Sequence, residues 1–221
     1  MTTRKKEVSI VLESVRQQGV VNGVEDLVLQ TNVGNIKARY HEAKGAKAAV
    51  VWVGGASGGL DGPAGGLYPR LAAQLTEYPI ASLRLHYRFP SNLENCVMDT
   101  LVGLTYLRLQ RGHERVALVG HSFGGAVVIN AGVLTTNVVA VAALSSQTYG
   151  TGLVDELSPR PLLLMHGTAD EILPDRCSQQ IYERANEPKE IRLYEGCRHG
   201  LDECRQQIDN DLLNWLSDKL Q

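Results

Sequence analysis

Residues 118–126 read LVGHSFGGA and continue an apolar run, ERVALVG (114–120). Such a run is typical of a buried parallel strand. Ser122 follows it, with Gly120 and Gly124 on either side in a G-x-S-x-G pattern. Glycines at these two positions allow a sharp turn in which the serine hydroxyl projects above the sheet at the start of a helix. The stretch therefore predicts a strand–turn–helix unit with Ser122 as a candidate nucleophile.

The rest of the chain repeats this alternation of strand and helix. Further buried-strand runs occupy residues 48–55, 80–87, 138–145, 160–167 and 189–196. Helical patterns occupy residues 68–78, 93–110, 124–135, 175–187 and 202–220. Alternating apolar and polar positions at 7–14, 24–31 and 35–43 predict antiparallel strands, the last two joined in a hairpin. We expect an α/β fold with a mostly parallel sheet, antiparallel N-terminal strands and helices on both faces.

Composition excludes several classes of protein. The 221 residues fit one domain, and we expect residues 1–221 to form it. A net charge of −2 gives no field that would attract nucleic acid or an anionic membrane. No apolar run approaches the roughly 20 residues of a membrane span. The N-terminus is basic, but the apolar stretch that follows the basic residues of a secretory signal is missing. We therefore expect a cytoplasmic protein.

The cysteines do not suggest a metal site. Cys96, Cys177, Cys197 and Cys204 lack the spacing of zinc ligands. In a protein without an export signal, reduced thiols are the default. We expect no metal, no cofactor and four free thiols, and the oligomeric state is left open.

A serine nucleophile needs a base and an acid, and both follow later strands. Asp170 lies in HGTADEILP, after the run at 160–167. His199 lies in RHG, after the run at 189–196. With GHSFGG around Ser122, these segments resemble the three catalytic loops of the α/β-hydrolase superfamily. The resemblance runs from about residue 24 to the last helix. It implies the α/β-hydrolase fold and a Ser–Asp–His triad.

The resemblance also implies an oxyanion hole made of backbone N–H groups. The Phe123 N–H, at the start of the helix after the turn, is one expected donor. Members of the superfamily take the second from the loop after the strand at 48–55, often behind a His-Gly pair. Here a glycine replaces that histidine, and the alignment gives Ala56 as the donor. Gly55 or Ser57 would take its place if the register shifts by one residue.

Other acidic residues compete with Asp170 for the acid role. Asp170 has the H-G-x-x-D spacing from His166 that the superfamily shows. Glu171 is its neighbour, Asp175 is expected to cap the next helix, and Asp202 is expected to start the last one. We therefore assign the acid role to Asp170.

The remaining candidates have structural interpretations. We expect His121 to face the junction of sheet and helix, and His166 to brace the acid loop. His41 and His113 are expected at the surface. Cys197 is close to His199 in sequence, but Ser122 already occupies the nucleophile position, so we do not assign a catalytic thiol.

The connection at 145–159 limits the size of any lid. It has room for one short helix, so we expect an open site without a large cap domain and a preference for short acyl groups. Leu60, Tyr149 and Leu153 are expected pocket residues. His86 is expected either to line the pocket or to pack at the solvent side.

These features predict a serine hydrolase that cleaves a carboxylic ester or thioester of a small substrate through an acyl-enzyme. It resembles small lidless members of the dienelactone-hydrolase-like or carboxylesterase-like type. Lactonase, acyltransferase or peptidase chemistry on the same residues remains open. So does a non-catalytic role as a ligand-binding or interaction protein on the same fold.

Overall fold

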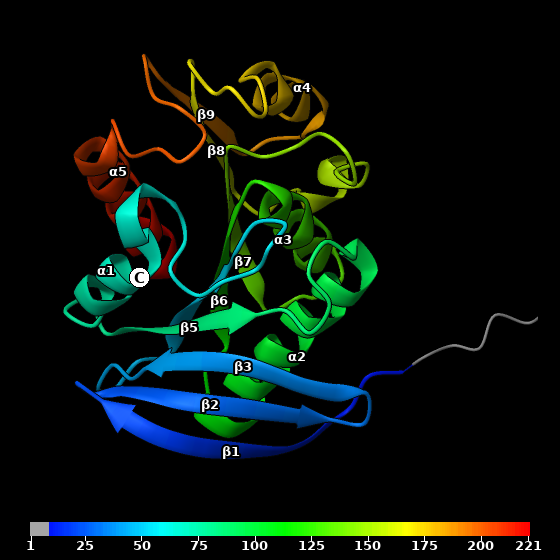
Figure 1. Ribbon diagram of the computed structural model, residues 1–221, viewed down its shortest axis with the longest axis vertical. Helices are drawn as coiled ribbons and strands as arrows, with labels where there is room; N and C mark the ends of the chain where they lie inside the picture. Colours follow the sequence, from blue (N-terminus) through cyan, green and yellow to red (C-terminus); the bar gives the residue numbers. More distant parts are fainter. Residues whose placement is uncertain (1–8) are drawn as a thin grey trace, which may run out of the picture.

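A nine-stranded sheet forms the centre of the computed structural model, which describes residues 9–221 (Figure 1). The strand order is β1-β2-β3-β5-β4-β6-β7-β8-β9. The antiparallel strands are β1 (Leu12–Val21), β2 (Val24–Thr31) and β3 (Gly34–His41). The parallel strands are β4 (Ala48–Val53), β5 (Ile80–His86), β6 (Arg115–His121), β7 (Val138–Leu144), β8 (Leu162–Gly167) and β9 (Lys189–Tyr194). The predicted sheet is confirmed.

Helices cover both faces of this sheet (Figure 1). One face carries α1 (Pro63–Leu75) and α5 (Arg205–Leu220). The other carries α2 (Leu93–Arg111), α3 (Phe123–Val133) and α4 (Arg176–Arg184). Side chains of β4 alternate between the two layers: Val50 and Trp52 pack toward α1 and α5, whereas Val51 and Val53 pack toward α2 and α3. Both faces of the central strands are therefore buried.

Two element boundaries differ from the sequence prediction. A strand was expected at 7–14, but β1 begins at Leu12 and continues to Val21, and residues 7 and 8 lie outside the described part. The last helix begins at Arg205 rather than at residue 202, because the preceding residues form the loop that carries His199. The predicted hairpin is confirmed, with Thr31 opposite Gly34.

The glycine-rich segment SGGLDGPAGG (57–66) runs into the first turn of α1. Pro63 starts α1, but Ala64, Gly65 and Gly66 have positive φ and depart from helical geometry. Positive φ is accessible to glycine at little cost, which explains the composition of this segment. The N–H of Ala64 donates to the carbonyl of Gly200 at 2.6 Å. The segment is therefore fixed against the His199 loop.

The segment between β7 and β8 contains one short helical turn, η1 (Val154–Leu157). No cap domain is inserted at this point or elsewhere in residues 9–221. The carboxyl ends of β4, β6, β8 and β9 lie at one edge of the sheet, because these strands are parallel. Ligand sites in open parallel sheets lie at this edge.

Candidate active site

Ser122 lies between the last residue of β6 and the first of α3, at φ 57° and ψ −120°. A positive φ is costly for a residue with a side chain and persists only where the surroundings enforce it. A Cβ on Gly120 would collide with the Gly124 carbonyl, and a Cβ on Gly124 would collide with the Gly54 carbonyl. The Ser122 N–H donates to the carbonyl of Leu144 at 2.8 Å. The predicted strand–turn–helix unit is confirmed, and its glycines permit close backbone approach.

A hydrogen bond joins the loops that follow β8 and β9. His199 Nδ1 lies 2.8 Å from Asp170 Oδ2. The Asp170 side chain is fully buried, and the His199 side chain is 16% exposed. Because Nδ1 is occupied by the carboxylate, Nε2 is the ring nitrogen left to exchange a proton.

The Asp170 carboxylate has further donors around it. Its Oδ1 accepts from the N–H groups of Ile172 at 2.9 Å and Leu173 at 2.8 Å. Its Oδ2 also accepts from His166 Nε2 at 3.0 Å. Burial raises the pKa of Asp170, but the hydrogen bonds from Leu173, His199 and Ile172 outweigh it and hold that pKa below its ordinary value. Asp170 is therefore an ionised acceptor for His199.

His166 braces this acid loop, as the sequence predicted. Its Nε2 also lies 2.9 Å from the carbonyl oxygen of Leu173. A carbonyl can only accept, so Nε2 carries the hydrogen. The other ring nitrogen lies 2.7 Å from Ser178 Oγ, and the ring is fully buried. The carboxylate of Asp170 is thus held by a side chain that is itself fixed at both nitrogens.

The competing acids take other positions. Glu171 Oε2 accepts a hydrogen bond from the main-chain N–H of His199 at 3.3 Å. Asp175 is at the N-cap position of α4 but makes no side-chain cap, so the predicted capping role is wrong. Asp202 precedes α5 instead of starting it. Of these acids, Asp170 is the one bonded to the imidazole of His199.

His121 connects the serine turn to the His199 loop. Its Nε2 donates to the His199 carbonyl oxygen at 3.0 Å, and the two rings lie 4.8 Å apart at 48°. Burial lowers the pKa of His121 to about 4, so the ring is neutral near pH 7. We expected this side chain to face the sheet–helix junction, and the structure instead places it against His199. Within residues 9–221, no hydrogen bond joins Ser122 Oγ to His199.

Buried tyrosines fix the loop that follows β4. Tyr68 donates its hydroxyl to the Val53 carbonyl at 2.8 Å, and Tyr87 donates to the Gly54 carbonyl at 3.0 Å. Both side chains are almost fully buried. Because a trans peptide directs its N–H away from its C=O, fixing these carbonyls also fixes the direction of the amides that follow.

The next carbonyls of this loop are engaged as well. The Gly55 carbonyl accepts from the Gly58 N–H at 2.9 Å, and the Ala56 carbonyl accepts from Ser91 Oγ at 2.8 Å. A Cβ on Gly55 would lie 3.4 Å from the Cβ of Ser122. The loop therefore runs directly beside the candidate nucleophile with a fixed backbone.

Exposed apolar side chains follow several strand ends at this edge. Tyr149, after β7, is 79% exposed and Leu153 is 38% exposed. Phe89, after β5, is 52% exposed, and Ile172, after β8, is 64% exposed. Leu60 lies in the glycine-rich segment and is half-buried. Leu60, Tyr149 and Leu153 stay predictions as pocket residues. Phe89 and Ile172 were not singled out from the sequence.

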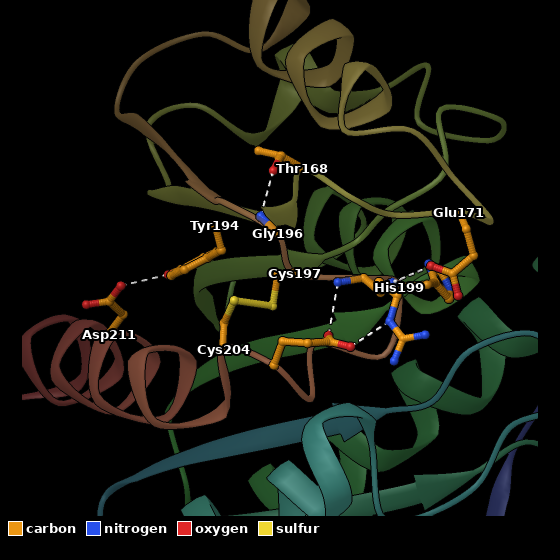
Figure 2. The surroundings of a disulfide bond; sticks show 10 residues. Thr168, Glu171, Tyr194, Gly196, Cys197, His199, Cys204 and Asp211 are labelled. Atoms are coloured by element: carbon orange, nitrogen blue, oxygen red, sulfur yellow. Dashed lines mark hydrogen bonds and ion pairs between the residues drawn. A yellow bond between two sulfur atoms is a disulfide. The ribbon is translucent and has the colours of Figure 1, made fainter.

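The expectation of four free thiols is wrong. Cys197 and Cys204 form a disulfide on either side of His199 (Figure 2). Cys96 and Cys177 are free. The pairing was missed because seven residues of sequence separation carry no disulfide signal by themselves, and β9 and α5 bring the two ends together.

Among residues 9–221, no group of three or more His, Cys, Asp or Glu side chains is placed to hold a metal ion. In the same part of the chain, no helix has the length and apolar character needed to cross a bilayer.

Comparisons with known proteins give matches at two levels. Residues 152–202, which include Asp170 and His199, match the family model of serine aminopeptidase S33. The uncharacterised protein YfhR of Escherichia coli O157:H7 is 33% identical over 135 residues, which cover 47% of this chain and 47% of that protein. YfhR of Escherichia coli strain K12 is 33% identical over 109 residues, covering 39% of this chain and 38% of that protein. The match thus spans less than half the length of these curated relatives.

Solved structures match over most of the chain. The dienelactone hydrolase of Anabaena variabilis has a TM-score of 0.79 at 15% identity, covering 89% of this chain and 97% of that one. XC6422 of Xanthomonas campestris, an α/β serine hydrolase without a lid, has a TM-score of 0.72 at 17% identity, covering 91% and 97%. Est1E of Butyrivibrio proteoclasticus, with ferulic acid bound, has a TM-score of 0.69 at 14% identity, covering 84% and 95%. The TM-scores establish a shared fold, and sequence identities this low establish nothing beyond the fold.

Proposed function

We propose that this chain, a lidless member of the α/β-hydrolase superfamily, is a serine hydrolase that cleaves a carboxylic ester or thioester of a small substrate through an acyl-enzyme. The observation that carries the proposal is the bond between His199 Nδ1 and the buried carboxylate of Asp170, at the same sheet edge as Ser122. The single domain over residues 1–221, the cytoplasmic location and the independence from cofactors belong to the same proposal.

In this mechanism, Ser122 Oγ attacks the substrate carbonyl and His199 Nε2 takes its proton. Asp170 holds Nδ1–H, which selects the tautomer with a free Nε2 and stabilises the imidazolium that forms. His199 then returns the proton to the leaving group, and the acyl group stays on Ser122. Water, activated by the same histidine, releases the acid in the second half of the cycle.

The oxyanion is held by backbone N–H groups. Phe123 is the first residue of α3, so its N–H has no acceptor within the helix and lies where the helix dipole favours negative charge. The second donor is Ala56, with Gly55 or Ser57 as the alternative, in the loop whose first carbonyls are fixed by Tyr68 and Tyr87. A fixed backbone here supports the proposal, because preorganised donors need no rearrangement as charge develops.

A small substrate with an apolar part fits the surroundings. The connection between β7 and β8 holds only the turn η1, so little protein covers the site from that side. Tyr149 and Ile172 present exposed apolar surface at this edge. Among the structural neighbours, one is described as a dienelactone hydrolase and another is described with ferulic acid bound. A compact ester with an aromatic or unsaturated part is consistent with both.

Peptidase chemistry is the second candidate, and one observation favours it. The segment 152–202 matches a serine aminopeptidase model, and it carries both Asp170 and His199. Turnover of p-nitrophenyl acetate compared with turnover of aminoacyl p-nitroanilides separates the two. We expect the ester to be cleaved and the anilides to remain intact.

A fluorophosphonate probe tests the nucleophile directly. We expect it to label Ser122, and Ser122→Ala to abolish labelling and lower kcat for p-nitrophenyl acetate by about 10⁴–10⁶-fold. Ser145→Ala is the matched control, because Ser145 is a fully buried serine directly after the neighbouring β7 and has no assigned role. Undiminished turnover in Ser122→Ala would remove the basis of the proposal.

A further inference from the structure

The disulfide between Cys197 and Cys204 brackets the loop that carries His199. The two Cα atoms are 5.8 Å apart, and His199 lies two residues after the first cysteine. Figure 2 shows the bond at the base of this loop, with His199 on the segment between the two cysteines. The disulfide therefore closes the loop as a small ring.

The N-terminal side of the ring is fixed to the acid loop without help from the disulfide. The Thr168 N–H donates to the Tyr194 carbonyl at 2.9 Å, and the Gly196 N–H donates to Thr168 Oγ1 at 3.0 Å. The Ala169 N–H then donates to the Cys197 carbonyl at 3.0 Å. These bonds continue the β8–β9 pairing up to the residue before Asp170.

The C-terminal side is fixed by the fully buried side chain of Leu201, by the bond from the Ala64 N–H to the Gly200 carbonyl, and by Cys204. Cys204 is the N-cap residue of α5, which is anchored in the core by Ile208, Leu212 and Leu216, all fully buried. A second link across the loop, Arg198 to Glu203, lies at the surface, where ion pairs contribute little. The disulfide is thus the covalent connection between the acid-loop side of the ring and a rigid helix.

We propose that the Cys197–Cys204 disulfide is a redox-dependent positioning element for His199: the hydrolase is fully active with the bond formed and has a lower kcat in the reduced form, which is the default form in a reducing cytoplasm. This rests on the proposed function. Bond formation removes two electrons and two protons from the two thiols. A low-molecular-weight disulfide such as oxidised glutathione accepts them and leaves as two thiols.

The site of the disulfide explains why kcat is the sensitive quantity. Asp170 and Ser122 are held by other elements. His199 is held by its bonds to Asp170 and His121, and the ring adds a covalent limit on how far its backbone can move away from them. A displacement of about 1 Å at a proton-transfer group costs as much as about 100-fold in rate. The expected pocket residues Leu60, Tyr149 and Leu153 lie on other loops, so KM should change little.

The test compares oxidised and reduced wild-type protein, with thiols counted by alkylation under denaturing conditions and intact mass. We expect two thiols after treatment with oxidised glutathione and four after a phosphine reductant. Reduction should lower kcat for p-nitrophenyl acetate by about 10–100-fold, with KM within about threefold. Reoxidation should restore kcat. Cys177→Ser, which changes a free cysteine on α4, should respond as the wild type does.

Hydrogen exchange of the 198–203 segment provides a readout that does not depend on activity. We expect faster exchange there in reduced protein and in the Cys197→Ser/Cys204→Ser double variant. Equal exchange and equal kcat in both redox states, or four thiols after oxidation, would overturn the proposal. If neither redox state turns over any ester but hydrogen exchange at 198–203 is still faster in the reduced protein, the proposed function fails. The disulfide is then still shown to hold the loop in place.

Discussion

His121 donates a hydrogen bond from its Nε2 to the main-chain carbonyl oxygen of His199 at 3.0 Å, with the two rings 4.8 Å apart. The residue next to the candidate nucleophile thus holds the backbone of the candidate base. Burial keeps His121 neutral by lowering its pKa to about 4, so the Nε2–H donor is present without a charge that would repel an imidazolium at His199. The contact positions His199 relative to the serine turn.

The first prediction concerns this contact. His121→Leu removes the donor, and we expect kcat for a small ester to fall about 10–100-fold because the base loop loses its support beside Ser122. His121→Gln keeps an amide N–H at a similar reach, and kcat should recover most of the loss. Steady-state kinetics on both variants, with circular dichroism to verify folding, check this. Equal losses in the two variants would show that the hydrogen bond is not what matters.

The second prediction separates Asp170 from another carboxylate of the same region. Asp170→Asn keeps the size of the side chain but favours the wrong imidazole tautomer, so kcat should fall about 10²–10⁴-fold. Asp175→Asn is the control, because the Asp175 carboxylate accepts a hydrogen bond from Gln179 on α4, whereas His199 is bonded to Asp170. It should stay within about threefold of wild type. If Asp170→Asn retains full activity, another group must orient His199.

The third prediction concerns acyl length. Each methylene that enters an apolar pocket is worth up to about 0.8 kcal/mol, or about fourfold in kcat/KM. The connection between β7 and β8 (residues 145–161) contains one short helical turn, η1, so a deep channel has little protein to form it. For p-nitrophenyl esters we expect kcat/KM to level off or fall beyond about C4–C6. A steady rise to long acyl chains would reveal an apolar channel between the exposed side chains of the site.

The topology could be predicted because its signals are local. The parallel strands β4 to β8 are apolar runs, since both of their faces are covered. The expectation of a buried run at 189–196 is wrong, because β9 is the edge strand and Tyr194 is its one buried residue. The glycines around Ser122 are explained by close backbone contacts that a Cβ would prevent. Asp170 was predictable by its spacing from His166, and the two side chains do meet. In each of these cases a short segment carries the complete pattern.

The parts that were missed depend on contacts between distant segments. His41 and His113 were expected at the surface but are 5% and 2% exposed. His41 accepts from Arg84 on the adjacent sheet strand, and His113 shares a hydrogen bond with Tyr40. The sequence around a histidine does not show which distant residue will bond to it. In the same way, the sequence around Cys197 and Cys204 does not show that a strand and a helix bring them together.

The fourth prediction concerns how the buried His41 makes the free energy of unfolding depend on pH. His41 Nε2 accepts a hydrogen bond from Arg84 Nε at 3.1 Å, so the ring must be neutral at that nitrogen. Burial, together with Arg84 and Arg39, lowers its pKa from 6.5 to about 4. In the unfolded chain the same ring binds a proton below about pH 6.5. The unfolded state therefore takes up protons that the folded state does not, and the free energy of unfolding falls as the pH drops from about 6.5 toward 4.

His41→Gln should reduce this pH dependence. A glutamine oxygen can accept from Arg84 but does not titrate, so the variant loses the His41 contribution, about 2 kcal/mol between about pH 7 and pH 5. His121, with the same lowered pKa, continues to contribute, so some dependence remains. Urea unfolding at several pH values across this window measures the effect. If His41→Gln and wild type lose stability in parallel as the pH falls, His41 is protonated in the folded state and its bond to Arg84 does not hold it neutral.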